Sequence, residues 1–406
     1  MTKRIQILIV GGSFGGLTTA YELRRHLGPD RAEITLISKD ERFTFVPSLT
    51  WVAMGSRKLS DISFDLAGPL AGKQVKFAHE TVIAIDTEQK SVTTTVAEHR
   101  YDFLIIATGH RSANEAVEGL GPFDGPGHSP MSPREAEELA SAVQGLLRQP
   151  GPIVVGAAPG ASCIGPAYEL AFELDHLLRR RKLRHLVPMT LVTPEPFLGH
   201  MGMGGVGKIR QLLEGEMEER EIRYQTSAAV TKITAEAVEV QELRPIESVL
   251  SIVIPPLAGI DAVAKSPGLS NPKGFIPIDK HYRHHSAEGV YAVGVAVALP
   301  PEGETPVPVN FPKTGHMTEQ MARIAVADIV ARVNGTEAPS AELSARCILD
   351  MGNRGAYINV DPVRPPRNRI PTVSEGWQWL LAKRAFERTY LWHARRGRKM
   401  PTTLGW

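Results

Sequence analysis

Cysteine is scarce in this chain, which has only two among its 406 residues. Two cysteines cannot build a structural disulfide framework, although they can form one redox pair. Long hydrophobic runs are also missing, because no stretch reaches the ~18–20 apolar residues that span a bilayer. The apolar run 5–10 is too short for the core of a signal peptide, so we expect a chain made in the cytoplasm.

An excess of one charge sign is missing as well. There are 46 lysine and arginine residues against 44 aspartate and glutamate residues, a net charge of +2. This balance excludes a nucleic-acid-binding protein that depends on a strong basic field, so nucleic acid is not an expected partner. No metal site is expected either. The length exceeds one compact core and predicts two or three domains.

A strand, a glycine turn and a helix occur twice in this order. The first copy has a strand at 5–10 and a helix at 17–27, and the second has a strand at 152–155 and a helix at 162–181. Further strands are expected at 34–38, 103–107, 189–193 and 289–297, and further helices at 133–147 and 314–333. The predicted fold class is α/β, with two Rossmann-like dinucleotide-binding domains, the second inserted into the first.

The first glycine turn has the context of a dinucleotide site, because it follows a strand and opens a helix. Gly11 permits the tight turn, Gly16 permits close packing of helix on strand, and the helix N-terminus offers N–H groups to a pyrophosphate. Ser13 takes the place of the usual middle glycine, and Phe14 follows it. The acid that would hold a ribose is missing. Ser38 and Lys39 are the expected substitutes, with Asp40 as the alternative.

The second glycine turn is degenerate. Ala158 and Ala161 stand where glycines would let the backbone approach a pyrophosphate, and Cys163 follows them. A thiol therefore occupies the place of a nucleotide. This pattern indicates a flavoprotein in which sulfur chemistry, rather than NADH, supplies electrons to the flavin.

Two later segments resemble flavoproteins with two dinucleotide domains. One is the strand end Ala107-Thr108-Gly109, and the other is 289–294, which ends at Gly294 and has Val295 in place of the usual aspartate. Their order along the chain matches that of the family. The resemblance implies bound FAD.

A more specific resemblance covers almost the whole chain and is to the sulfide:quinone oxidoreductases. The segments that carry it are 45–48 (FVPS), 160–169 (GASCIGPAYE), 195–200 (EPFLGH), 305–308 (TPVP), 312–315 (PKTG), 345–352 (ARCILDMG) and 381–387 (LAKRAFE). The family implies a cysteine pair on one flavin face, quinone on the other, and a C-terminal membrane foot. Sulfide and quinone are the implied substrates.

The resemblance implies a role for individual residues. Cys163 and Cys347 form the redox pair, with Cys163 facing the flavin and Cys347 carrying the sulfane sulfur. Glu169 and His200 move protons. The further residues implied to contact FAD are Pro47, Val82, Lys313 and Gly315, and those implied to line the quinone pocket are Phe45, Ile348, Phe386 and Tyr390.

Other interpretations stay open at these positions. Either cysteine could be a small buried hydrophobe, His200 an exposed loop residue, and Glu169 a packed polar residue. Cys163 is expected in the first turn of its helix, where the dipole would lower its pKa. Two departures from the family are Met131 and Glu135, which stand where one subgroup has a third cysteine and a histidine.

The tail is strongly basic from Arg364 onward. A helix is expected at 374–396, with aromatic residues on two opposite faces. One face can pack on the protein while the other enters a lipid headgroup layer, and the alternative is a plain core helix. We expect peripheral attachment to the cytoplasmic face of a membrane. Whether the chain forms a homo-oligomer stays open.

The expected domain boundaries follow from these motifs. The FAD-binding domain takes 1–110 and 256–335, a linker takes 111–150, the second Rossmann-like domain takes 151–255, and the C-terminal membrane-associating region takes 336–406. The competing functions are a type II NADH:quinone dehydrogenase, for which Glu195 would be the ribose-binding acid, an exported sulfide dehydrogenase, and a flavin-binding redox sensor.

Overall fold

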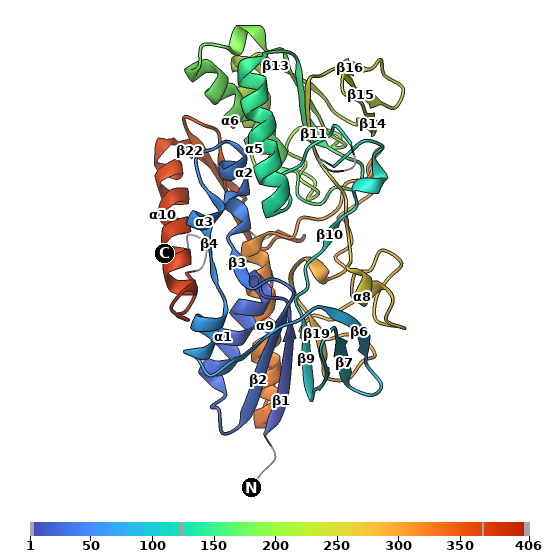
Figure 1. Cartoon of the computed structure of the whole chain (residues 1–406), viewed down its shortest axis with the longest axis vertical. Coiled ribbons are helices and arrows are strands. Elements are labelled where there is room, and N and C mark those ends of the chain that lie inside the picture. The colour runs from blue at the N-terminus through green and yellow to red at the C-terminus, as the bar shows by residue number, and fades with distance from the viewer. Residues whose placement is uncertain (1–3, 122, 124, 368, 402–406) are drawn as a thin grey trace.

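Five parallel strands form the first sheet, at the N-terminal end of the molecule (Figure 1). The structure is a computed structural model that describes residues 4–401 except 122, 124 and 368. The strands, in sheet order, are β19 (Val290–Ala292), β9 (Phe103–Ile106), β1 (Ile5–Val10), β2 (Ala32–Ser38) and β5 (Lys76–His79). Because β9 and most of β1 are apolar and buried, the sheet is covered on both faces, as parallel sheets are.

Helices α1 (Phe14–His26) and α9 (Gly315–Asn334) pack against each other beside this sheet. α9 begins after Thr314, whose hydroxyl accepts a hydrogen bond from the N–H of Met317. It ends at Gly335 in the left-handed conformation. The helix expected at 314–333 is therefore confirmed, within one residue at each end.

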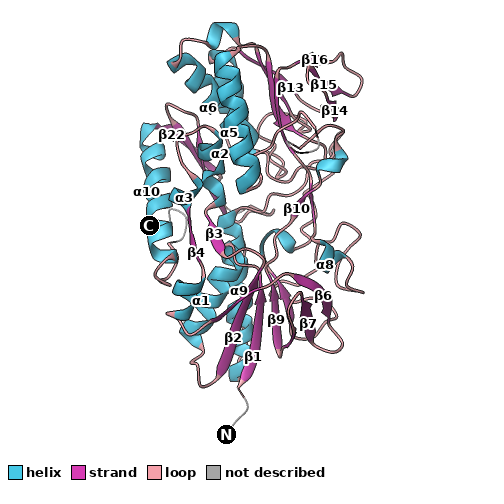
Figure 2. Ribbon diagram, in the orientation of Figure 1, coloured by secondary structure: helices cyan, strands magenta, loops and turns pink. Residues whose placement is uncertain are grey.

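A second parallel sheet lies at the other end of the long axis (Figure 2). Its strands, in sheet order, are β13 (Ile222–Gln225), β12 (Met189–Val192), β11 (Ile153–Ala157) and β17 (Leu250–Ile254), and its helices are α5 (Pro133–Arg148), α6 (Gly165–Arg180) and α7 (Ile209–Glu219). The chain leaves the first sheet after β9 and returns to it at β19. The predicted fold class, with one Rossmann-like unit inserted into another, is confirmed.

The C-terminal region is an antiparallel sheet followed by helix α10 (Trp377–Ala394). The strands are β20 (Ala345–Asp350), β21 (Gly355–Val360) and β22 (Thr372–Gly376), and β20 packs against α6. The helix expected at 374–396 was placed too early, because residues 372–376 pair with β21 as a strand. None of the helices in the described part of the chain is long and apolar enough to cross a membrane.

Short elements connect these units. The strands are β3 (Arg42–Thr44), β4 (Ser63–Asp65), β6 (Val82–Asp86), β7 (Ser91–Thr94), β8 (Glu98–Arg100), β10 (Arg111–Ser112), β14 (Val230–Ile233), β15 (Ala237–Val240), β16 (Ile246–Glu247) and β18 (Leu257–Ala258). The helices are α2 (Leu49–Ala53), α3 (Leu59–Ile62), α4 (Ala67–Ala71) and α8 (Asp261–Ala264).

Candidate active site

Most of the predicted FAD residues gather at one edge of the first sheet. Gly11 follows β1, Ser38 ends β2, Thr108 follows β9 and Gly294 follows β19. These strands are parallel and adjacent, so their carboxyl ends lie side by side. This edge is where open α/β sheets bind dinucleotides.

The glycine turn at this edge is built for close approach. Gly11 has a φ of +113°, and a Cβ there would lie 2.2 Å from the carbonyl oxygen of Ala107. A Cβ on Gly16 would lie 1.7 Å from the carbonyl oxygen of Gly11. Ser13 precedes α1 but its side chain caps no N–H group, and the first turn holds no acid. The helix N-terminus is therefore available to a pyrophosphate.

The polar groups around this turn also fit a cofactor. The hydroxyl of Thr108 is buried and has no hydrogen-bond partner among the described residues. Gly109, with a φ of +70°, faces open space, and the Ser38 hydroxyl lies over the turn, 2.9 Å from a Cβ built on Gly12. An orphaned hydroxyl beside open space is what a ligand would satisfy. The alternative residue Asp40 donates its N–H to Ser38.

Charged groups converge on the same edge through His110. Burial, together with the charges of Lys313 and Lys39, lowers the pKa of His110 to about 4. The Lys313 ammonium donates to the carbonyls of Val295 at 3.1 Å and Val297 at 2.6 Å. Burial lowers the pKa of Lys313 to about 7, so its positive charge is only partial at neutral pH.

Four other predicted FAD residues lie in different segments of the chain. The ring of Phe14 lies 3.4 Å from a Cβ built on Gly315. Val82 begins β6, which follows the end of β5, and Pro47 is exposed in the short helix Val46–Ser48. Their contacts with FAD stay predictions.

The second glycine turn is closed by another part of the chain. The N–H of Gly160 donates to the carbonyl of Pro308 at 2.6 Å, and the side chain of Asn310 donates to the carbonyl of Gly160 at 2.7 Å. Ala158 and Ala161 are fully buried. Glu195 is also engaged, because its carboxylate accepts hydrogen bonds from Tyr168, Thr193 and Met201. The second glycine turn and Glu195 are therefore both held by contacts within the chain, and neither is free to bind a nicotinamide nucleotide.

The two cysteines are free thiols, and Cys163 acts on the ionisation of Cys347. Burial raises the pKa of Cys163 to about 11 and that of Cys347 to about 12, with Cys163 adding to the shift of Cys347. The expected lowering of the Cys163 pKa is wrong. Helix α6 begins only at Gly165, so Cys163 lies before its first turn, and desolvation dominates.

A buried ion pair lies beside the cysteines. Lys383 of α10 donates a hydrogen bond to Glu169 of α6, and both affect the ionisation of Cys347. Burial raises the pKa of Glu169 to about 7, which Lys383 opposes and Asp350 reinforces. A carboxyl group with this pKa can give or take a proton at neutral pH.

Two further carboxylates join this pair and were missed by the sequence analysis. Glu169, Glu173 and Asp350 place one oxygen each within 4.8 Å of one another. Asp350 accepts a hydrogen bond from the Trp51 indole at 2.8 Å, and burial raises the pKa of Glu173 well above its ordinary value. The spacing of Glu169 and Glu173, four residues apart on one helix face, was a readable signal.

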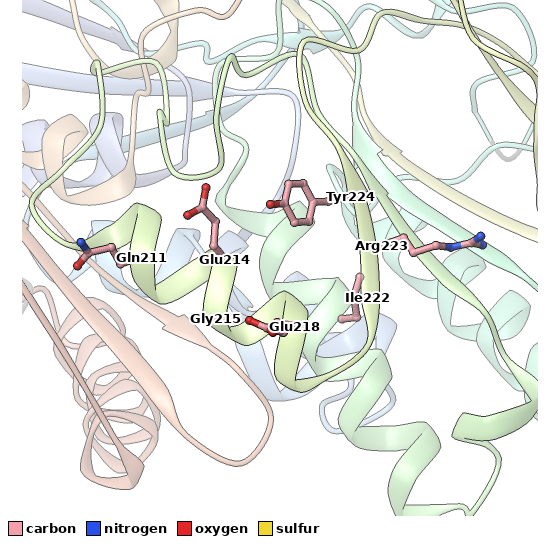
Figure 3. Close-up of a pocket in the computed structure, with 7 residues that line it drawn as sticks. All are labelled: Gln211, Glu214, Gly215, Glu218, Ile222, Arg223 and Tyr224. Atoms are coloured by element: carbon pink, nitrogen blue, oxygen red, sulfur yellow. The ribbon is translucent and has the colours of Figure 1, made fainter.

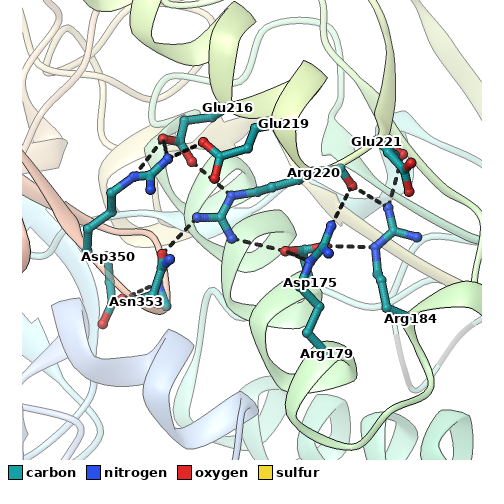
Figure 4. A network of polar contacts seen from close by, with 11 residues as sticks. Asp175, Arg179, Arg184, Glu216, Glu219, Arg220, Glu221, Asp350 and Asn353 are labelled. Atoms are coloured by element: carbon teal, nitrogen blue, oxygen red, sulfur yellow. Dashed lines mark hydrogen bonds and ion pairs between the residues drawn. The ribbon is translucent and has the colours of Figure 1, made fainter.

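An ionic network holds the turn after β20, the strand that carries Cys347. Arg220 of this network donates to Asp175 at 3.0 Å and to Asn353 in the turn at 3.0 Å (Figure 4). Glu216 accepts from Arg220 and from Arg354, which lies beside Asn353. Because these carboxylates come from α6 and α7, the network fixes Cys347 relative to the second sheet.

An aromatic cluster brings together three of the four predicted quinone residues. The ring centroid of Phe45 lies 5.1 Å from that of Tyr390 and 6.0 Å from that of Phe386. Phe14 joins them, with its ring 5.6 Å from that of Phe45. Ile348 lies on β20 next to Cys347, so the two side chains point to opposite sheet faces.

Glu319 of α9 is a buried acid at the cluster that the sequence analysis also missed. Burial raises its pKa to about 7, which Arg323 and the hydroxyl of Tyr390 oppose. The helix 314–333 was expected, but its pattern alone did not distinguish this acid from solvent-exposed ones.

The remaining sequence candidates have local roles. The ring nitrogen Nδ1 of His200 accepts the N–H of Gly202 at 3.2 Å, and burial lowers the pKa of His200. Glu135 accepts the Ser129 hydroxyl at 2.9 Å, and Met131 packs on the core. A proton-transfer role for His200 stays a prediction.

A large surface hollow lies apart from these residues. It has a volume of about 880 Å³ between α7 and the edge strand β13. Figure 3 shows Glu214 of α7 and Tyr224 of β13 on its walls. No predicted site residue lines it.

Comparisons with known proteins agree with this geometry. The family model described as pyridine nucleotide-disulphide oxidoreductase matches residues 5–323. A sulfide-quinone reductase of Aquifex aeolicus is 37% identical over 404 residues, which is 98% of this chain and 92% of that protein. The chain belongs to the sulfide:quinone oxidoreductase family.

A solved structure of a family member has the same fold. The crystal structure of the sulfide:quinone oxidoreductase from Aquifex aeolicus superposes with a TM-score of 0.93 at 36% identity, covering 98% of this chain and 93% of that one. A type II NADH:quinone oxidoreductase of Staphylococcus haemolyticus is 29% identical over 117 residues, 29% of each protein. Sulfide:quinone oxidoreductases are flavoproteins, and this chain is an FAD-dependent oxidoreductase.

The glycine turn gives a first testable prediction. We expect Gly16→Ala to cost about 1–3 kcal/mol in folding free energy and to lower the FAD content of the purified protein, because the added methyl group collides with the Gly11 carbonyl. The flavin-to-protein absorbance ratio measures this loss. Gly145→Ala is the control, since its Cβ meets open space in α5 and is expected to stabilise by about 0.5–1 kcal/mol. Full FAD retention in Gly16→Ala would contradict the assignment of the first glycine turn to FAD binding.

Proposed function

We propose that the protein oxidises sulfide to sulfane sulfur or polysulfide and reduces a membrane quinone. The observation that carries this proposal is that two cysteines far apart in the sequence lie beside the same buried Glu169–Lys383 pair, where Cys163 and Glu169 both raise the pKa of Cys347. The name of the 37% identical relative supports the same substrates.

The sulfur chemistry starts from a disulfide between Cys163 and Cys347. Hydrosulfide attacks one sulfur and forms a persulfide there, while the disulfide bond breaks and the other cysteine leaves as thiolate. Because burial raises the pKa of both thiols, the leaving thiolate takes up a proton. Glu169, with its pKa raised to about 7 by burial, is the group we assign to donate it. A second sulfur nucleophile then removes the outer sulfur and leaves the second thiol.

Closing the cycle requires an electron acceptor. Re-forming the disulfide from two thiols releases two protons and two electrons. FAD supplies the two-electron carrier between the cysteines and quinone. The rings of Phe45, Phe386 and Tyr390 offer an apolar aromatic wall to a quinone, and Glu319 can hold a proton beside them. Which cysteine carries the sulfane sulfur stays a prediction.

Membrane attachment rests on the outer face of α10. Trp377, Leu381 and Trp392 are 68%, 54% and 40% exposed, and arginines lie among them. Trp379 lies toward the protein, stacked on Tyr357 at 4.5 Å. This division of aromatic residues suits a peripheral helix in the headgroup layer. The cytoplasmic face stays a prediction.

Steady-state kinetics test the function. Sulfide should drive the reduction of a soluble short-chain quinone with sulfane sulfur as product. A purified FAD-containing protein that turns over quinone with NADH but not with sulfide would contradict the proposal.

Membrane attachment gives a second prediction. Trp377→Ser with Leu381→Ser should weaken binding to anionic vesicles by about tenfold or more, because two exposed apolar side chains no longer enter the lipid. Vesicle cosedimentation measures the loss. Trp379→Leu is the matched control and should lower the melting temperature while vesicle binding is retained. Equal vesicle binding by the double variant and the unmodified protein would contradict a lipid-facing α10.

A further inference from the structure

A basic groove runs along the C-terminal half of α10. It has a volume of about 440 Å³, and its walls include Arg388, Trp392, Arg395 and Arg396 of the α10 region and Arg57 of the preceding α2–α3 loop. None of these residues belongs to the cysteine site or to the aromatic cluster. The groove therefore needs its own explanation.

The two acids of the groove have hydrogen-bond partners. Glu387 accepts hydrogen bonds from Arg57 at 3.0 Å and from the Ser48 hydroxyl at 2.5 Å. Asp61 accepts the N–H of Lys58 at 2.8 Å. Glu387 thus neutralises the guanidinium of Arg57, while Asp61, in the part of the chain that the structure describes, forms no ion pair with Arg388, Arg395 or Arg396.

Three guanidinium groups have no acidic partner within the described residues. Arg395 donates to the carbonyl of Ser63 at 3.3 Å and Arg396 to the carbonyl of Trp392 at 3.4 Å, while Arg388 makes no ion pair. Like charges gathered in one groove repel each other, so an anion bound between them would be stabilised. Guanidinium groups match the geometry of phosphate oxygens and can bind them in pairs.

The surroundings identify the source of the phosphate. Leu381, Arg388 and Trp392 follow one another at intervals of seven and four residues, so they share one face of α10. Leu381 and Trp392 are exposed apolar side chains of that face. An anionic group with hydrocarbon attached would satisfy the arginines and these side chains together, as at a membrane interface.

We propose that this groove is a binding site for the phosphate of an anionic phospholipid headgroup. The proposal rests on the membrane attachment of the proposed function and adds a discrete lipid site to it. Phe386 and Tyr390 of the aromatic cluster lie on the same helix, so a lipid held here would fix the position of that cluster relative to the membrane.

Vesicle binding with two kinds of negative charge tests the site. One vesicle contains phosphatidylcholine with phosphatidylglycerol, and the other contains phosphatidylcholine with cholesteryl hemisuccinate, a carboxylate amphiphile, at matched surface charge. We expect the protein to prefer the phosphatidylglycerol vesicles by at least about tenfold, the size of one charge-assisted hydrogen bond. Arg388→Gln with Arg396→Gln should abolish this preference.

The matched control removes two charges outside the groove. Arg384→Gln with Lys399→Gln should weaken binding to both vesicles equally and keep the preference. If the groove variant and the control variant lose binding equally to both kinds of vesicle, the protein is held by diffuse electrostatic attraction to the membrane surface and the proposal is wrong. If inorganic phosphate stabilises the protein through the groove arginines while no vesicle preference exists, the ligand is a free anion and the lipid assignment is overturned. Bleaching of the flavin by sulfide in buffer without vesicles tests the proposed catalytic function separately.

Discussion

Cys163→Ser and Cys347→Ser are each expected to lower the rate of sulfide-dependent quinone reduction by at least about 10³-fold. Serine cannot form a disulfide or carry sulfane sulfur, and removing a nucleophile commonly costs this much or more. The measurement is steady-state reduction of a soluble quinone by sulfide. Each variant must keep its FAD spectrum, so that the loss is assigned to the thiol rather than to the cofactor.

A double variant that carries both cysteine-to-serine changes should be no slower in sulfide-dependent quinone reduction than either single variant, because the cysteines act as one pair. Residues that act as a unit show losses that do not add. A Cys347→Ser variant with more than about a tenth of the original rate would be incompatible with a chemistry that needs both thiols.

Lys383→Met is expected to destabilise the protein by about 3–5 kcal/mol at pH 8, because it leaves Glu169, Glu173 and Asp350 buried without a cation. Although burial alone would lower the pKa of Lys383, these carboxylates hold it above its usual value. Melting temperature and denaturant unfolding measure the loss. Arg384→Met, the exposed neighbour, should change stability by no more than about 0.5 kcal/mol.

The pH dependence of this effect has a definite sign. Burial raises the folded-state pKa values of Glu169 and Glu173 above their unfolded value of 4.5. The folded protein therefore binds more protons than the unfolded chain, and stability falls as pH rises from the unfolded value through the folded values. Without Lys383 the fall in stability with rising pH should be steeper. The stability of the Lys383→Met variant should therefore be closest to that of the unmodified protein near pH 5. Adding Glu169→Gln should restore part of the stability, and equal destabilisation at pH 5 and pH 8 would contradict the account.

The FAD edge could be predicted because its signals are local. A glycine turn between an apolar strand and a helix fixes backbone geometry by itself, and Gly11 and Gly16 lie in contact with neighbouring backbone as expected. The order of parallel strands then brings Ser38, Thr108 and Gly294 to the same edge. Thr314 likewise marked the start of α9 through its capping hydroxyl.

The residues that surround the cysteines were harder to predict from the sequence. Pro166 in the first turn of α6 was a readable sign that the helix starts near 165 rather than 162. The direction of the Cys163 pKa shift depends on burial by distant segments, which local sequence does not report. Lys383 was given no role of its own, although it lies in the basic tail and in the segment 381–387. A helix pattern does not reveal that Glu169 from another helix is its partner.

Anaerobic mixing of the oxidised, FAD-containing protein with sulfide tests directly whether sulfide reduces the flavin through the two cysteines. We expect sulfide to bleach the visible flavin absorbance promptly, and neither cysteine variant to respond to sulfide. NADH should leave the absorbance unchanged, because the second glycine turn is closed by Pro308 and Asn310. Bleaching by NADH together with no response to sulfide would contradict these expectations.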